Sequence, residues 1–221
     1  MAFLGRQLRL VRSWLDVAQI FAIDNSGRSD YNIRCWVVQP LWSYMMNRFV
    51  LHEDPFIAAK MHCDKHVVKM ILEEAQMLST AHRLLDGEEY VDDTGARKIK
   101  RWCLPNTEKE LVLYKATHVK HPCTVWSMQS RANYVWSLQL LEGLLNEYTH
   151  RYGKHHKTEY VYERLLDAPK NIPIGPLTMF PQAMPDACKR DNPVDGYRTY
   201  YIEHKKDFAK WTSRPQPEWW I

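Results

Sequence analysis

Residues 54–87, DPFIAAKMHCDKHVVKMILEEAQMLSTAHRLLDG, decide the fold that the sequence predicts. Asp54 supplies a helix-capping acceptor, Pro55 suits the first helical position, and the next Gly or Pro is Gly87. Apolar side chains recur at helical spacing and form one packing face. That face consists of Val67, Ile71, Ala75 and Leu78. We therefore expect one long amphipathic helix from Pro55 to about Leu85.

The opposite face of this helix carries a polar line. Its members, separated by three or four residues, are His62, His66, Lys69, Glu73, Gln76 and Thr80. A helix turns about 100° per residue, so these side chains share one side. Imidazoles titrate near neutral pH and suit proton transfer or phosphate contact, and a carboxylate can act as a general acid or base. The sequence thus predicts that the working face of the protein lies here.

A second long helix is predicted from Pro122 to Tyr152, where Gly153 ends it. Shorter helices are expected over residues 107–120, 159–166 and 193–211. The polar residues 86–106 indicate a loop or a β-hairpin, and the proline-rich residues 169–187 indicate an irregular connection. The prediction is an all-α class, mainly α with at most a small β-hairpin. It describes a single compact helical domain built on two long helices.

Residues 1–45 differ from the rest of the chain. Their first half is basic and in isolation resembles a mitochondrial presequence, and translated upstream sequence is the other interpretation. Met46 is followed by the β-like run 47–51 and looks like a natural chain start. We expect residues 46–221 to form the functional module and residues 1–45 to be an extension outside it.

Composition indicates the compartment and the partner. The five cysteines are scattered and include no CxxC pair, which is typical of a reducing compartment. No apolar run is long enough to span a membrane, so we expect a cytoplasmic protein, in the host cell if it is viral. A net charge of +4, with local basic clusters, 9 Trp and 12 Tyr, favours a polyanionic partner such as DNA.

Further contacts are expected from the second long helix and the tail. Arg131 is predicted to approach the polar line and either to pair with Glu73 or to hold a phosphate, with Tyr134 as its i,i+3 neighbour. His118 and His121 precede the helix start, where free N–H groups hold anions. Trp211 and the aromatic tail are expected to cover the site.

A metal site is an alternative for the same histidines. His62 and His66, at i and i+4, could bind one ion, and His118, His121 and Cys123 could complete the site. The sequence lacks the Glu that follows the first His in zinc peptidases. We therefore expect neither a metal nor another cofactor.

Three stretches together resemble a group of phage-encoded proteins. They are residues 62–73 (HCDKHVVKMILE), 131–134 (RANY) and 147–154 (EYTHRYGK). The nearest family with an assigned activity is the phage pyrimidine-dimer DNA glycosylases of the endonuclease V type. That family's Asp-x-His-aliphatic-aliphatic stretch and catalytic Glu are similar to residues 64–68 and Glu73, at matching spacing.

The resemblance implies a small all-α enzyme that cuts DNA at damaged bases, with Glu73 as acid/base. The family's nucleophile is the α-amine of a terminal Thr, whereas this chain continues upstream and has Asn47 after Met46. Lys65 or Lys69 is therefore expected to supply a Schiff-base amine. The family's arginines beside the catalytic Glu are replaced by Leu72 and Gln76.

The sequence-based prediction is a DNA glycosylase/AP lyase that acts on pyrimidine dimers or another damaged or modified base. Glu73, Lys69 and Lys65 would be catalytic, and the expected substrate contacts are His62, His66, Arg131, Tyr134, His118, His121 and Trp211. A DNA base- or nucleotide-modification enzyme and a non-catalytic phage accessory protein, binding nucleic acid or a host protein, are the alternatives.

Overall fold

The computed structural model describes residues 46–220, so the expectations for residues 1–45 lie outside the described part. Its elements are α1 (Pro55–Met61), α2 (Asp64–Asp86), β1 (Glu88–Asp92), β2 (Ile99–Cys103), α3 (Thr107–Val112), α4 (Pro122–Gln129), α5 (Arg131–Tyr152), α6 (Glu159–Leu165), the 3-10 helix η3 (Asp186–Cys188) and α7 (Pro193–Lys205). The strands pair in one antiparallel hairpin, which confirms the predicted mainly α class. No helix within residues 46–220 is long and apolar enough to cross a bilayer.

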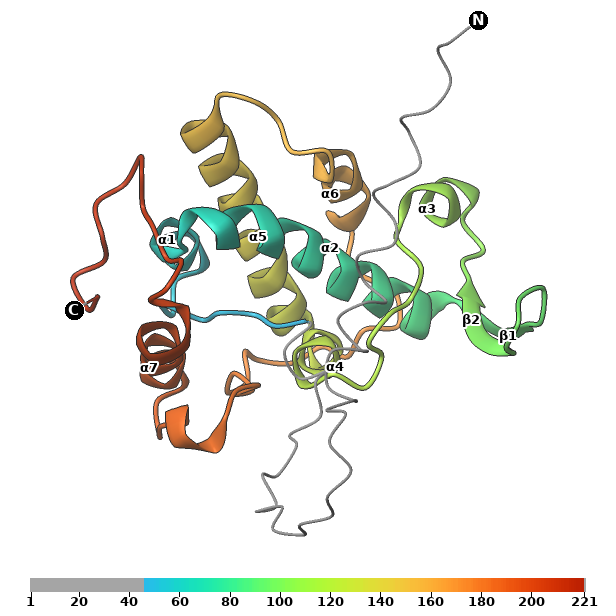
Figure 1. Ribbon diagram of the computed structural model, residues 1–221. Coiled ribbons are helices and arrows are strands. Elements are labelled where there is room, and N and C mark those ends of the chain that lie inside the picture. The colour runs from blue at the N-terminus through green and yellow to red at the C-terminus, as the bar shows by residue number, and fades with distance from the viewer. Residues whose placement is uncertain (1–45, 221) are drawn as a thin grey trace, which may run out of the picture. The chain divides into compact units, whose positions relative to one another are not determined.

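Helix α2 is central to the described part. It packs against α5 and α4, and α1 packs against α5. Figure 1 shows α1, α7 and the C-terminal tail near one end of α2, and α3 and the hairpin near the other. Gly143 of α5 permits a close approach to α1, because a Cβ there would lie 2.8 Å from the Cβ of Ala59.

The predicted single helix from Pro55 is wrong, because the chain breaks at His62 and Cys63, whose backbones are extended. Polar groups from distant segments bind the main chain at the break. Arg151 donates to the carbonyl of His62 at 2.9 Å, and the main-chain N–H of Asp64 donates to the carbonyl of Lys210 at 2.8 Å. These bonds replace those of a continuous helix, so His62 does not lie on the same helix as Glu73.

The predicted helix from Pro122 to Tyr152 is also divided, at Ser130. This residue has an extended backbone, and its hydroxyl accepts from the amide of Asn133 at 3.1 Å as the cap of α5. The same hydroxyl donates to the carbonyl of Pro176 at 2.8 Å, so the proline-rich connection fixes the break. The predicted end at Gly153 is confirmed, with a left-handed φ of 63°.

Two other predicted helices are shorter than expected. The helix expected over residues 107–120 ends at Val112, and the helix expected to reach Trp211 ends at Lys205. Beyond Lys205 the chain turns back, and Trp211 donates from Nε1 to the carbonyl of Met61 at 3.0 Å. In the chain after α7, tertiary hydrogen bonds therefore take the place of the helical hydrogen bonds that were predicted beyond Lys205.

The segment Met46–Leu51, which we call the buried segment, runs through the core outside any helix or strand. Arg48 is fully buried within it. Its guanidinium binds both oxygens of the Glu74 carboxylate, at 2.8 and 2.6 Å, and lies 5.0 Å from the ring centroid of Trp126. Ser127 accepts a further bond from Arg48 at 2.9 Å. The segment is thus anchored to α2 and α4 by a buried ion pair.

We predict that Arg48→Met destabilises the protein by about 3–5 kcal/mol, because it leaves the carboxylate of Glu74 buried without its partner. Urea unfolding monitored by circular dichroism measures this. Lys100→Ala is the control, because the Lys100–Glu89 ion pair is exposed and its loss should change the free energy of unfolding little. Equal effects of the two substitutions would contradict the anchoring role.

Candidate functional site: the α2–α7 cluster

Glu73 is a nearly buried carboxylate on α2, with 5% of its surface exposed. One carboxylate oxygen accepts from the main-chain N–H of Asn47 at 3.0 Å. The other lies 2.9 Å from the ammonium of Lys69, whose side chain is 48% exposed. The carboxylate is therefore held between the buried segment and a lysine that reaches solvent.

The surroundings of Glu73 act on its proton affinity in opposite directions. Burial raises the pKa of the carboxyl above its usual value and is the largest effect. Lys69, the N–H of Asn47 and the more distant charge of His118 lower that pKa. A carboxylate whose charged form is costly, but is held by a mobile cation, suits proton transfer.

The loop before α4 brings His118 towards Glu73. Thr80 of α2 fixes this loop by accepting from the amide of Thr117 at 3.1 Å. His118 is exposed and has a left-handed φ of 49°. His121 instead caps α4 by accepting from the amide of Cys123 at 3.2 Å, and burial lowers its pKa to about 4. Only the first of these two histidines remains available as a surface contact.

Aromatic rings join Glu73's face of α2 to α7. Phe49 of the buried segment stacks on His66 with ring centroids 4.5 Å apart. The ammonium of Lys205 lies 5.8 Å from the centroid of the same Phe49 ring. We call Glu73, Lys69, His66, Phe49 and Lys205 the α2–α7 cluster.

His66 is a buried, neutral member of this cluster. A hydrogen bond joins its Nδ1 to the hydroxyl of Tyr201. Burial, with the charges of His62, Lys205 and Lys69, lowers its pKa to about 2. The ring is uncharged at neutral pH, which corrects the expectation that His66 contacts substrate phosphate as a cation.

Other predicted contacts lie inside the protein. His62 is fully buried, donates from Nδ1 to the carbonyl of Ala58 at 2.7 Å, and has a pKa lowered by burial to about 4. Tyr134 is also buried, and its hydroxyl donates to the carbonyl of Leu165 at 2.8 Å. Trp211 packs against Trp220 with ring centroids 4.9 Å apart. These three side chains support the core, which corrects their expected role as substrate contacts.

Arg131 is exposed at the start of α5, where its amide donates to the carbonyl of Pro173 at 2.8 Å. Within residues 46–220, no ion pair joins Arg131 to Glu73, whose direct partners are Lys69 and Asn47. The predicted approach of Arg131 to Glu73 is therefore not found. Lys65 is exposed, with its ammonium 5.2 Å from the ring centroid of Phe208.

Sequence reasoning did not single out Lys205 or Phe49 for the site. Lys205 follows Tyr201 by four residues on the helix that begins at Pro193, so helical spacing places these two side chains on one face. That spacing could have drawn attention to Lys205. Phe49 carried no comparable signal, because its place depends on how the buried segment threads the core.

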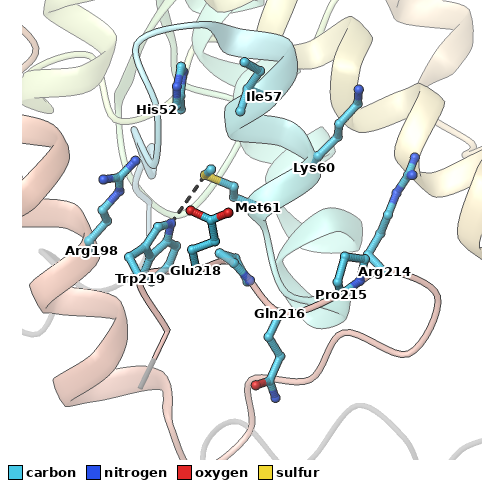
Figure 2. A pocket seen from close by; sticks show the side chains of 11 residues that line it. His52, Ile57, Lys60, Met61, Arg198, Arg214, Pro215, Gln216, Glu218 and Trp219 are labelled. Carbon is cyan, nitrogen blue, oxygen red and sulfur yellow. Dashed lines mark hydrogen bonds between the residues drawn. The ribbon is translucent and has the colours of Figure 1, made fainter.

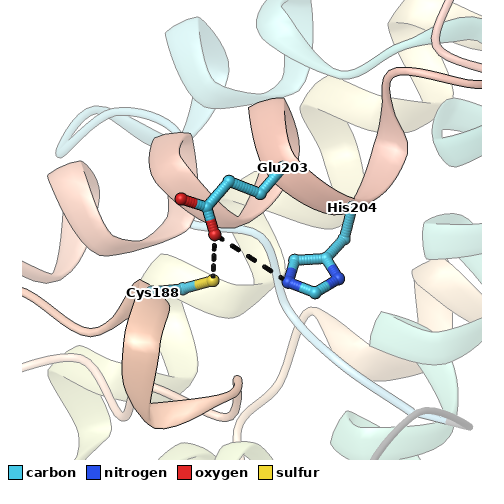
Figure 3. A group of neighbouring side chains, drawn as sticks. All are labelled: Cys188, Glu203 and His204. Carbon is cyan, nitrogen blue, oxygen red and sulfur yellow. Dashed lines mark hydrogen bonds and ion pairs between the residues drawn. The ribbon is translucent and has the colours of Figure 1, made fainter.

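The predicted alternative metal site is not assembled. Within residues 46–220, the group of side chains close enough to share a metal ion is Cys188, Glu203 and His204 (Figure 3). Cys188 donates from its thiol to Glu203 at 3.2 Å, and His204 lies 4.0 Å from the same oxygen. Burial and Glu203 raise the pKa of the Cys188 thiol to about 11, so it stays protonated and satisfies the carboxylate itself.

A pocket of about 580 Å³ lies between α1, α7 and the C-terminal tail. Figure 2 shows Arg198 on one side of it and Lys60 and Arg214 on the other, with Glu218 between them. Arg198 also donates to the carbonyl of Leu51 at 3.0 Å, so the buried segment connects this pocket to the α2–α7 cluster. The excess of cations makes the pocket suitable for an anionic group.

The chain matches no protein-family model, and no curated protein or solved structure matches it either.

We predict that His66→Gln weakens the acid sensitivity of the fold. The folded-state pKa of about 2 lies below the usual 6.5, so the stability that neutral His66 contributes is complete above pH 6.5 and falls as the pH drops. Between pH 7 and 5 the wild-type protein should lose about 2 kcal/mol more free energy of unfolding than the variant. Urea titrations at both pH values measure this, and equal losses in the two proteins would refute it.

Proposed function

We propose that the protein is a DNA glycosylase and AP lyase acting on a damaged base, with a pyrimidine dimer as the first candidate. The observation that carries this proposal is the buried carboxylate of Glu73 between a main-chain N–H and the ammonium of Lys69. Such a group can exchange a proton with a sugar while an amine bonds to the sugar carbon. The resemblance to the phage glycosylases, whose catalytic Glu is at matching spacing, supports the same role.

The proposed reaction starts with attack of a neutral amine on C1′ of the damaged nucleotide. The bond between C1′ and the base breaks, and the base leaves with the electron pair and takes up a proton. The C1′–O4′ bond of the sugar ring then breaks, O4′ takes up a proton, and an iminium ion remains at C1′. Removal of a proton from C2′ then expels the 3′ phosphate, which cuts the strand. Glu73 would carry the protons between these steps, since its pKa is raised towards the working range by burial.

DNA binding would rest on cations around the cluster. Lys65 and Lys69 are exposed on α2, and His118 is exposed on the neighbouring loop. The cationic pocket lies at the other end of the buried segment, where Arg198 donates to the carbonyl of Leu51. Phosphates on either side of the lesion could occupy these two places, which would hold the damaged nucleotide over Glu73.

We predict that the wild-type protein nicks UV-irradiated and abasic duplex DNA, and leaves undamaged DNA intact. Glu73→Gln keeps an acceptor for Asn47 but cannot exchange the proton, so nicking should fall at least about 100-fold. Glu163→Gln, on the exposed side of α6, is the matched control and should behave as wild type. Gel electrophoresis of end-labelled duplexes measures all three proteins.

The outcome separates the alternatives. Nicking of abasic DNA alone would restrict the proposal to a lyase. Binding without nicking, unchanged by Glu73→Gln, would replace it with a non-catalytic DNA-binding protein. Modification of undamaged DNA without strand cutting would indicate a base-modification enzyme instead.

A further inference from the structure

Lys205 places an amine against an aromatic surface at the end of α7. Its ammonium lies 4.4 Å from the ring centroid of Tyr200 and 5.8 Å from that of Phe49. It donates one hydrogen bond, to the hydroxyl of Tyr200 at 3.3 Å. The side chain is half-buried, so the amine meets solvent on one side and an apolar wall on the other.

Lys205 differs from the two lysines that the sequence pattern favoured. Lys69 is neutralised by Glu73 at 2.9 Å, and Lys65 is exposed to solvent. Within residues 46–220, no carboxylate lies at ion-pair distance from the ammonium of Lys205. Its neighbours Glu203 and His204 face Cys188 (Figure 3).

The groups around Lys205 lower the pKa of its ammonium. Burial lowers its pKa below the usual value and is the largest effect, and the charge of Lys69 adds to it. The thiols of Cys63 and Cys188 act in the opposite direction, but burial raises the pKa of both, so both are protonated at neutral pH. A half-buried lysine without a counter-ion, next to a second cation, has the setting of an amine nucleophile.

We propose that the ε-amine of Lys205 is the nucleophile of this site, and that its substrate is a sugar carbonyl carbon, the C1′ aldehyde of an abasic deoxyribose. The inference rests on the proposed lyase function and supplies the residue that replaces a terminal α-amine. Nitrogen bonds to C1′, the aldehyde oxygen leaves as water after taking up two protons, and a protonated imine remains. Loss of a C2′ proton then expels the 3′ phosphate with its bonding electron pair.

The side chains around Lys205 would have separate roles in this reaction. Phe49 and Tyr200 cover one side of the amine, which limits the water that could hydrolyse the imine. Lys69 connects the two ends of the cluster, since it pairs with Glu73 and its charge acts on Lys205. Neutral His66 stacks on Phe49 and holds that ring in place beside the amine.

The test is reductive trapping with sodium borohydride on an end-labelled abasic duplex. Borohydride reduces the imine to a stable amine, which joins the protein to the DNA. We expect trapping in wild type, a loss of at least 100-fold in Lys205→Arg, and no change in Lys206→Arg, the exposed neighbour. Peptide mapping of the wild-type adduct should place the modification on Lys205, and this measurement decides the matter even if Lys205→Arg folds poorly.

Three results would overturn the inference in different ways. If wild type traps the DNA but the adduct maps to Lys65 or Lys69, or if Lys205→Arg traps normally, the lyase function stands and Lys205 is excluded. If wild type nicks abasic DNA without any trapped species, the reaction does not pass through an imine and no lysine is its nucleophile. If wild type neither nicks nor traps, the proposed function itself fails.

Discussion

Burial of the segment Met46–Leu51 is the constraint on which the rest of the described structure depends. A buried chain outside any helix or strand must satisfy its backbone polar groups through other means. The N–H of Asn47 binds Glu73 of α2, and the carbonyl of Leu51 accepts from Arg198 of α7. The segment therefore joins α2 to α7, which makes the cluster between them a consequence of the fold.

The adjacent carboxylates Glu73 and Glu74 of α2 differ in burial and in their cationic partners. Glu74 is completely buried, and Arg48 occupies both of its oxygens. Glu73 shares its oxygens between a main-chain N–H and the half-exposed Lys69, whose ammonium can move away. The partner of Glu74 is buried, whereas the partner of Glu73 reaches solvent. Two consecutive residues of α2 thus differ in whether their cation is accessible from outside.

The sequence was sufficient for the mainly α class, for several helix starts and for the spacing of Lys69 and Glu73, because these depend on local patterns. Pro55, Pro122 and Pro193 begin their helices as predicted, and the line from Lys69 to Glu73 is on one face. The breaks after Met61 and at Ser130 could not be predicted in the same way. They depend on residues distant in sequence: Arg151 donates to the carbonyl of His62, and the carbonyl of Pro176 accepts from Ser130.

The predicted histidine line failed for the same physical reason. A break in the helix rotates His62 into the core, and aromatic residues of α7 cover His66. Helical periodicity assigns a residue to a face, but it does not say whether another element covers that face. Lys205 shows the converse case, since its position matters only once Phe49 lies beside it.

The sequence separation of the buried segment's contacts has a consequence for how the protein is made. Tyr197 meets Asn47 across 150 residues, and Arg198 meets Leu51 across 147. Such distant pairs carry a larger loop-closure entropy and form slowly. During synthesis the buried segment can already bind α2 and α4, while its contacts with α7 form only when α7 leaves the ribosome. The α2–α7 cluster is then completed last, so a partly made chain holds Glu73 but not Lys205.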